Sequence, residues 1–224
     1  MKLINAKIDS FNFASKKIDI LFNSANYSIV PVKGIGVFEP RIWLETFGKP
    51  LTRNIVKAKI VHTNMGLTLP IKQFASNQNR YIVELAGLHS YTEHSKLLTQ
   101  LLSELYADIQ NEVITRIDIA IDFKEKVPKK IINALNKNRS SFIYINTCYL
   151  KTNKEGKTNS YINICIYPKH IKENLDFEIG RLEFSFRGSY LRGKYLVKDL
   201  DKLLKKIKKT IKKFTGLEVN IQSL

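Results

Sequence analysis

Residues 115–123, TRIDIAIDF, alternate polar and apolar side chains, and this segment constrains the fold more than any other. Side chains of a β-strand point alternately to the two faces of the sheet, so the isoleucines of the segment share one face. The opposite face carries Arg116, Asp118 and Asp122. An isoleucine face belongs in a hydrophobic core, and the sequence therefore predicts a strand that holds two carboxylates on the side away from that core.

Three further segments, 81–86, 162–169 and 181–187, alternate in the same way between apolar and polar side chains. Their polar positions are Glu84, Tyr167, Lys169, Arg181, Glu183 and Arg187. The pattern has two interpretations. Each segment could be a half-solvated antiparallel strand whose polar face meets water, or the four strands could combine their polar faces into one functional surface.

Amphipathic periodicity predicts helices at 92–110, with Thr92 as N-cap, at 129–137 and at 196–214. The apolar stripe of the last helix consists of Leu200, Leu203, Leu204, Ile207, Ile211 and Phe214. Segments 140–150 and 160–169 are expected to pair as a hairpin. Residues 1–60 indicate a β-rich N-terminal part with several short strands, including 17–22 and 35–48. The mixed order predicts one α+β domain over 1–224, an antiparallel-rich sheet with helices packed on one face.

The charge of the chain indicates a polyanionic partner. Lys and Arg number 37 against 20 Asp and Glu, which gives a net charge of +17. Nucleic acid is the first partner of this kind, and an anionic membrane surface is the second. No segment has the roughly 20 apolar residues of a membrane-spanning helix, and the first ten residues lack the apolar run of a signal peptide. The protein is therefore expected to be soluble and cytoplasmic.

Carboxylates in the middle of apolar strands repel one another unless a neighbouring arginine or a divalent cation neutralises them. Oxygen ligands alone favour Mg²⁺ or Mn²⁺ over zinc. The candidate metal ligands are Asp118, Glu183, Glu84 and Asp122. The histidines, at 62, 89, 94 and 170, show no zinc-ligand spacing, and Cys148 and Cys165 are expected to be buried free thiols.

Tyr167 is the candidate nucleophile. In ICIYPKH, Tyr167 and Lys169 are two residues apart, so an extended strand would place them on one face. A phenol has a pKa near ~10 and needs a neighbouring cation or base to act as a nucleophile. Lys169 is positioned by the sequence to supply that positive charge. The alternative is a tyrosine that only packs at the rim of the sheet.

Three motifs in this order, TRIDIAID, ICIYPK and GRLEFSFRGSYLRG, resemble the replication initiators of filamentous phages, of the gene II type, and the Rep-trans rolling-circle initiators of plasmids. The resemblance covers roughly residues 80 to 200. It implies a metal-dependent, site-specific DNA nicking and joining enzyme that starts rolling-circle replication in the bacterial cytoplasm through a covalent phosphotyrosine. By this resemblance Tyr167 is the nucleophile, Lys169 the adjacent lysine, and Asp118 and Glu183 the strand acids. Glu84 lies where the phage proteins also have a strand with Glu, whereas the position of Asp122 is not acidic throughout the family.

A nicking enzyme of this kind needs locally single-stranded origin DNA, and host replication proteins are possible further partners. FRGSYLRGKY interleaves basic residues with an aromatic ring that could stack on an unpaired base. The candidate DNA contacts are Arg116, Arg181, Arg187, Tyr190, Arg192 and Lys194. Two alternatives remain: a non-catalytic origin-binding protein with the same fold, and an RNA-binding sheet that uses Tyr144 and Tyr161.

Overall fold

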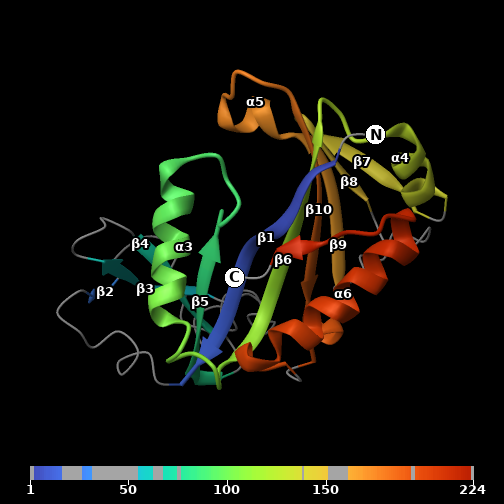
Figure 1. Ribbon diagram of the computed structural model, residues 1–224. Helices are drawn as coiled ribbons and strands as arrows, with labels where there is room; N and C mark the ends of the chain where they lie inside the picture. Colours follow the sequence, from blue (N-terminus) through green and yellow to red (C-terminus); the bar gives the residue numbers. More distant parts are fainter. Residues whose placement is uncertain are drawn as a thin grey trace, which may run out of the picture.

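A single sheet runs through the molecule, with its strands in the order β2-β3-β4-β5-β1-β6-β10-β9-β8-β7 and with β11 paired to β1 (Figure 1). The computed structural model describes residues 3–16, 27–31, 55–62, 68–74, 77–137, 139–150, 161–192 and 195–222. The strands are β1 (Leu3–Ser15), β2 (Tyr27–Pro31), β3 (Ile55–His62), β4 (Thr68–Phe74), β5 (Asn77–Ala86), β6 (Val113–Lys124), β7 (Ser141–Tyr144), β8 (Thr147–Leu150), β9 (Ile162–Pro168), β10 (Ile179–Arg187) and β11 (Ile221–Gln222). All neighbouring strands in that order are antiparallel, and β1 and β11 are parallel.

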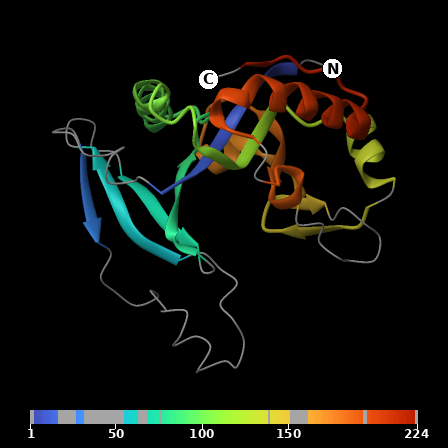
Figure 2. The same cartoon turned by 90° about the horizontal axis from the view of Figure 1, so that it is seen from below.

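Three of the described helices, α3, α4 and α6, cover one face of this sheet (Figure 2). The described helices are α3 (Glu93–Leu105), α4 (Lys129–Asn136), α5 (Lys169–Glu173) and α6 (Leu200–Thr215), with short 3-10 turns η1 (Gly188–Tyr190) and η2 (Val197–Asp199). Figure 2 shows α3, α4 and α6 together on one side of the central strands. The predicted α+β class, with an antiparallel sheet and helices on one face, is confirmed.

The hydrophobic core lies between those helices and the apolar face of the sheet. The isoleucines of β6, Ile117, Ile119 and Ile121, are all fully buried there. The leucines and isoleucines of the α6 stripe are buried against the same core, while Phe214 at its end is half-buried. Burying one face of each strand and one stripe of each helix leaves the opposite strand faces free for polar side chains.

Figure 2 also shows how the sheet curves. Strands β2–β4 bend away from the helices at one end of the sheet, and β7 and β8 do so at the other end. The polar faces of β1, β6, β10 and β9 therefore form the floor of a concave surface between these two ends. In the described part of the chain, no helix has the length and apolarity that crossing a membrane requires.

The structure corrects the expected layout in two places. Segment 140–150 was expected to be one strand, but it forms its own hairpin, in which β7 and β8 pair and Ile145 turns with a φ of 53°. That turn contains no Gly or Pro, so the sequence of 140–150 has the pattern of one continuous strand. The predicted pairing of 140–150 with 160–169 holds for β8 and β9. Segments 17–22 and 35–48 lie outside the described residues.

The second correction concerns the ends of two helices. Thr92 precedes α3 as predicted, but its side chain makes no capping bond and instead contacts the hydroxyl of Ser90 at 2.6 Å. Strand β9 ends at Pro168, and Lys169 begins α5. The alternation that would place Tyr167 and Lys169 on one strand face therefore stops before it reaches the lysine.

Candidate active site

The register of the central strands brings the predicted polar positions onto one surface. Across β6, β10 and β9, Asp122 lies opposite Arg181, which in turn lies opposite Tyr167. One row along, Glu183 lies between Ala120 and Cys165. On the other side of β6, Glu84 of β5 lies opposite Asn12 of β1, which lies opposite Arg116. The four strands with alternating patterns thus contribute to the same face, which the solvated-strand interpretation does not require.

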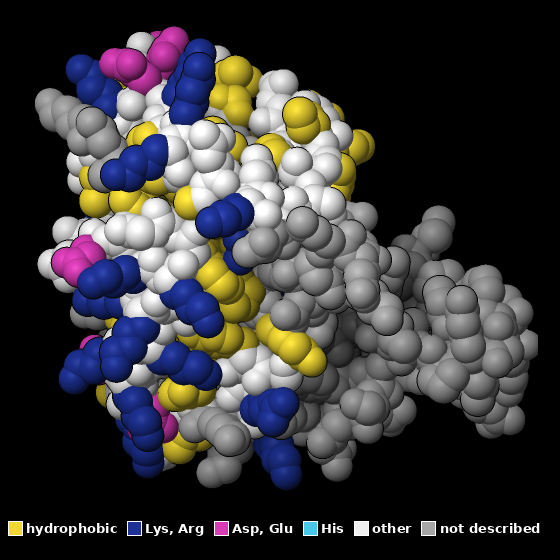
Figure 3. Space-filling model, turned by 90° about the vertical axis from the view of Figure 1, so that its right-hand side faces the viewer, with side chains coloured by type: hydrophobic (Ala, Val, Ile, Leu, Met, Phe, Trp, Pro, Cys, Tyr) yellow, Lys and Arg dark blue, Asp and Glu magenta, His cyan; other side chains and the backbone are white. Residues whose placement is uncertain are grey.

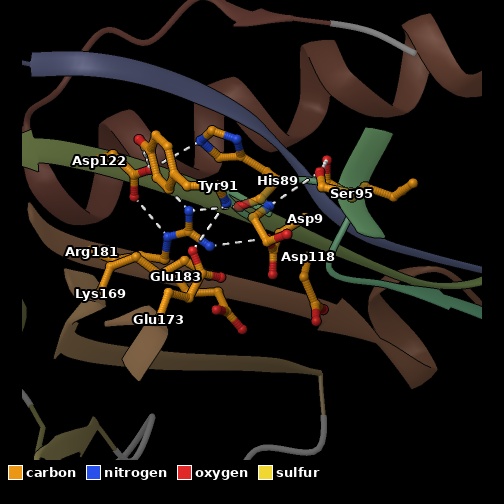
Figure 4. Close-up of polar contacts among 12 residues, drawn as sticks. Asp9, His89, Tyr91, Ser95, Asp118, Asp122, Lys169, Glu173, Arg181 and Glu183 are labelled. Atoms are coloured by element: carbon orange, nitrogen blue, oxygen red, sulfur yellow. Dashed lines mark hydrogen bonds and ion pairs between the residues drawn. The ribbon is translucent and has the colours of Figure 1, made fainter. Parts of the chain in front are cut away.

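Arg181 and Asp122 form a buried ion pair at one end of this surface (Figure 4). Arg181 is fully buried and donates to both oxygens of Asp122, at 2.7 and 2.9 Å. It also donates to Asp9 at 3.0 Å and to the backbone oxygen of His89 at 2.8 Å. A guanidinium with these partners and no exposed surface cannot contact DNA in this arrangement, so the predicted DNA contact by Arg181 is corrected to a structural ion pair.

Both oxygens of Asp122 are engaged by donors. Besides Arg181, the Tyr91 hydroxyl donates to Oδ2 at 2.9 Å, and His89 Nε2 lies 3.0 Å from the same atom. Burial alone would raise the pKa of Asp122, but the hydrogen bonds from His89 and Arg181 hold it well below its usual value. Burial and the neighbouring Asp122 raise the pKa of Tyr91 to about 12. This carboxylate stabilises the fold and has no oxygen left to hold a metal ion.

Asp118 is paired with the arginine two residues before it on β6. Arg116 donates through Nε to Asp118 Oδ1 at 2.9 Å and through Nη2 to Oδ2, and Nη2 also reaches the Ser185 hydroxyl at 3.3 Å. Asp118 is buried, whereas 38% of the Arg116 side chain is exposed. The Arg116 side chain is therefore partly open to solvent although it is paired with Asp118.

Tyr167 of β9 and Glu183 of β10 form a buried hydrogen-bonded pair on neighbouring strands. The buried Tyr167 hydroxyl donates to Glu183 Oε2 at 2.8 Å. Burial and the negative charge of Glu183 raise the pKa of Tyr167 far above that of a free phenol. Burial and the nearby carboxylates of Asp9 and Asp118 raise the pKa of Glu183 as well. The Glu183 carboxylate is thus the hydrogen-bond acceptor of the Tyr167 hydroxyl.

The cation next to Tyr167 differs from the one that the sequence suggested. Lys169 is buried and pairs with Glu173 one helical turn later in α5. The ammonium of Lys172 lies over the Tyr167 ring instead, 4.9 Å from its centre. Because Lys172 is exposed, its charge is available to an incoming phosphate.

A cavity of about 420 Å³ opens above Tyr167 and Glu183. Its basic side chains are Arg116, Lys172 and Arg187, and its far wall is made by Phe142 and Tyr149 of the β7–β8 hairpin. A tyrosine hydroxyl, a carboxylate, three cations and two aromatic rings thus surround one space. This combination suits a nucleotide, because the phosphate meets the cations and the base meets the rings.

The predicted metal site stays a prediction. No three His, Cys, Asp or Glu side chains within the described ranges stand in position to hold a metal ion. Asp9, Asp118 and Glu183 nevertheless lie close enough that both aspartates raise the Glu183 pKa. An all-oxygen set of this kind fits Mg²⁺ or Mn²⁺ only if Asp118 turns away from Arg116 and Asp9 turns an oxygen away from Arg181. Glu84 lies on β5, two strands from Asp118, and accepts a bond from Asn12 at 3.2 Å.

The remaining predicted DNA contacts divide into two groups. Arg187 is exposed at the cavity, and Arg192 is exposed beyond η1. The ring of Tyr190 is not open to a base, because it packs on Phe186 with centroids 4.8 Å apart and has the Lys206 ammonium 4.1 Å from its centre. Its hydroxyl bonds to Thr210 of α6 at 2.8 Å, and Lys194 lies outside the described residues.

Sequence reasoning missed Asp9, Lys172 and the aromatic wall of the hairpin. Asp9 was missed because β1 changes register between Ile8 and Ser10, which interrupts the alternation that would have revealed it. Lys172 was missed because it faces Tyr167 only once α5 has formed. Phe142 and Tyr149 lie opposite each other in the β7–β8 register, and an Asn146 turn signal could have revealed their pairing.

The fold is similar to that of a known replication protein. No protein-family model and no curated protein matches this sequence. The rolling circle replication initiator protein from Geobacillus stearothermophilus aligns with a TM-score of 0.51 and 15% identity, over 92% of this chain and 84% of that one. The TBP of Methanococcus jannaschii aligns with a TM-score of only 0.32 and 14% identity, over 93% of this chain and 98% of that one, which does not indicate a shared fold. The first likeness shows a common fold with a rolling-circle initiator.

Proposed function

We propose that this protein nicks and rejoins DNA and that it initiates rolling-circle replication, with Tyr167 as its nucleophile. The observation that carries the proposal is the hydrogen bond from Tyr167 to Glu183 at the base of a cavity lined by Arg116, Lys172 and Arg187. The fold shared with the Geobacillus initiator and the net charge of +17 support the same function. The sequence motifs around Asp118, Tyr167 and Glu183 fit it independently.

The reaction is a transesterification at phosphorus. Glu183 takes the proton of the Tyr167 hydroxyl, and the phenolate oxygen attacks the phosphorus of a DNA strand in the cavity. The bond from phosphorus to the 3′ oxygen breaks, and that oxygen takes up a proton from water. The products are a 5′-phosphotyrosyl link and a free 3′-OH, which can later attack the same link and rejoin the strand without ATP.

The basic side chains stabilise the charge that develops on the phosphoryl oxygens. Arg116 and Arg187 lie opposite each other on β6 and β10, so their guanidinium groups can bind one phosphate from two sides. Lys172 adds a third positive charge next to Tyr167. Removing one preorganised donor of this kind typically lowers the turnover rate by about 10²- to 10³-fold.

Asp118 and Glu183, together with Asp9, are the residues that would hold Mg²⁺ or Mn²⁺. When bound, such an ion supplies a Lewis acid for a non-bridging phosphate oxygen. Asp122 is left out because Arg181, Tyr91 and His89 occupy both of its oxygens. Glu84 is left out because it lies two strands from Asp118.

The substrate would be origin DNA that is locally single-stranded, in the cytoplasm of a bacterial host, with host replication proteins extending the 3′ end. The test is conversion of supercoiled replicon DNA to open circles by the purified protein with Mg²⁺ or Mn²⁺. Wild type is expected to nick, and Tyr167→Phe is expected to bind the DNA equally well without nicking. Equal loss of binding and nicking in Tyr167→Phe would contradict the proposal.

A second candidate is an origin-binding protein with this fold that does not cut DNA. The observation in its favour is that Asp118 already has an arginine partner, as Asp122 does. Such a protein would bind the same DNA without metal, and its affinity would not depend on the Tyr167 hydroxyl.

A further inference from the structure

Tyr167 lies at the boundary between two cavities. The first, of about 420 Å³, contains Glu183 and the arginines described above. The second, of about 370 Å³, lies between the tip of the β7–β8 hairpin and α5. Both cavities are lined by Thr147, Tyr149, Tyr167 and Lys172. A chain that passes from one cavity to the other must therefore pass the Tyr167 side chain.

The two cavities differ in character. The first is polar, with Arg116, Arg187 and Glu183 around its base and Phe142 in its wall. The second is more apolar and is lined by Tyr144, Ile145 and Ile171. These hairpin side chains are well exposed, with 49% of Phe142, 65% of Tyr144 and 77% of Ile145 accessible to solvent. Figure 3 looks onto the side of the molecule where the hairpin lies and shows hydrophobic side chains exposed among basic ones.

We propose that the two cavities are base-binding subsites for single-stranded DNA, one on each side of the phosphate that Tyr167 attacks. Phe142 and Tyr149 hold a base in the first cavity, and Tyr144 holds the neighbouring base in the second. Lys172, which lines both cavities, meets the phosphate that joins the two nucleotides. The inference rests on the proposed role of Tyr167 and adds to it the way in which the strand is seated.

The charge and the aromatic side chains of the two cavities favour single-stranded DNA over another protein chain as their occupant. Arg116 and Arg187 line the first cavity and Lys172 lines both, and the whole chain carries a charge of +17, which disfavours a second copy of the chain as the occupant. Aromatic rings beside cations are the usual platform for unpaired bases, since every base offers a π-face. Phe142 and Tyr149, which both line the first cavity, are stacked on each other with their ring centroids 5.1 Å apart and their planes 15° from parallel.

The test compares two ten-nucleotide probes, a fluorescent oligo-dT and a decamer of abasic spacers with the same phosphates. Both are titrated by fluorescence anisotropy against Tyr167→Phe protein without metal, so that no cutting occurs. Stacking of one base on an aromatic ring is worth about 5- to 150-fold in affinity. The protein is therefore expected to bind oligo-dT at least 5-fold more tightly than the abasic decamer.

Three further substitutions, each made in the Tyr167→Phe protein, test which side chains cause the preference for oligo-dT. Phe142→Ala and Tyr144→Ala each remove one ring, and each is expected to weaken oligo-dT binding by about 5-fold or more without changing abasic binding. Ile143→Ala is the matched control, because Ile143 is 75% exposed on the same strand and lines neither cavity. It is expected to change neither affinity. Urea unfolding of each variant verifies that the fold is retained.

Equal affinity for both probes, or an equal loss on both probes in Phe142→Ala and Tyr144→Ala, would overturn the inference. So would a wild-type dimer in sedimentation that Tyr144→Ala dissociates, because the hairpin would then be a contact between copies. The inference and the proposed function fail separately. Tighter binding of oligo-dT without any nicking would support the base-binding subsites and contradict the proposed enzymatic function. Nicking with equal affinity for both probes would support the enzymatic function and contradict the subsites.

Discussion

Tyr167 and Glu183 are joined by a hydrogen bond of 2.8 Å between the neighbouring strands β9 and β10, with the hydroxyl as donor. Both groups have raised pKa values because both are buried and the carboxylates of Asp9 and Asp118 lie close to Glu183. The pair is therefore electrostatically costly in the folded protein. A cost of this kind is typical of residues kept for chemistry, since stability alone would favour uncharged side chains.

Glu183→Gln is expected to lower single-turnover nicking by about 10²-fold or more, because the glutamine can neither take the Tyr167 proton nor bind a metal ion as a carboxylate would. Its free energy of unfolding at pH 7 is expected to equal or exceed that of wild type. The raised pKa means that the ionised Glu183 destabilises the fold above that pKa, and the cost disappears as the pH falls and the carboxyl takes up a proton. Urea unfolding at pH 7 and pH 4 checks this sign, and a variant that nicks normally but unfolds easily would contradict it.

Asp122→Asn is expected to destabilise the protein by about 3–5 kcal/mol, because it leaves the buried Arg181 charge without its partner. The lowered pKa of Asp122 gives this loss a pH dependence. The ionised Asp122 carboxylate contributes its full stabilisation above about pH 3.9, the pKa of an aspartate in the unfolded chain. This stabilisation is lost as the pH falls through the lower pKa that Asp122 has in the folded protein.

The stability difference between wild type and Asp122→Asn should thus be constant from about pH 5 to 8 and shrink below about pH 4. Urea unfolding across this range measures it. The exposed Asp108→Asn serves as control and should change stability by less than about 0.5 kcal/mol. A difference that grows toward low pH would contradict the ion-pair assignment.

Substitutions of Lys169 and Lys172 are expected to affect different properties, the first mainly stability and the second mainly the nicking rate. Lys172→Met removes the cation over the Tyr167 ring and is expected to lower nicking by about 10²-fold with little loss of stability. Lys169→Met removes the cation that pairs with the largely buried Glu173 carboxylate and is expected to lower mainly the free energy of unfolding. Nicking rates and urea midpoints of both variants decide the assignment, and a reversed result would return the cationic role to Lys169.

Addition of Mn²⁺ is expected to raise the melting temperature, because a bound divalent ion relieves the repulsion among Asp9, Asp118 and Glu183. At about 100 times the dissociation constant the gain is about 2.7 kcal/mol, or several degrees for a chain of this size. EDTA should reverse the shift, and Asp118→Asn should abolish it. Glu84→Gln should retain it, since Glu84 lies two strands away. An unchanged melting temperature in wild type would contradict the metal proposal.

The sequence predicts the strands of this fold well wherever alternation is unbroken. Strands β6, β9 and β10 and the stripe of α6 follow directly from periods of two and 3.6 residues. Strand β1 lies in the middle of the sheet but was hidden, because register shifts at three points break its alternation. The β7–β8 hairpin was hidden because Ile145 occupies a turn position that usually carries Gly or Asn.

The candidate site was predictable as a surface but not as a set of contacts. Alternation placed Asp118, Asp122 and Glu183 on one face, as the register confirms. It could not separate the Asp122 carboxylate, which Arg181 and Tyr91 occupy, from the Glu183 carboxylate, which faces Tyr167. That distinction depends on burial and on partners that are far apart in sequence, so only the folded chain displays it.

The most direct test of the central claim is to map the covalent adduct. Wild-type protein is incubated with single-stranded DNA of its own origin and Mn²⁺, digested with protease and nuclease, and analysed by mass spectrometry for a tyrosine that carries a 5′-nucleotide. The account predicts the adduct on Tyr167, with none in Glu183→Gln over the same time. An adduct on another tyrosine, or free 5′-phosphate ends with no adduct at all, would contradict it.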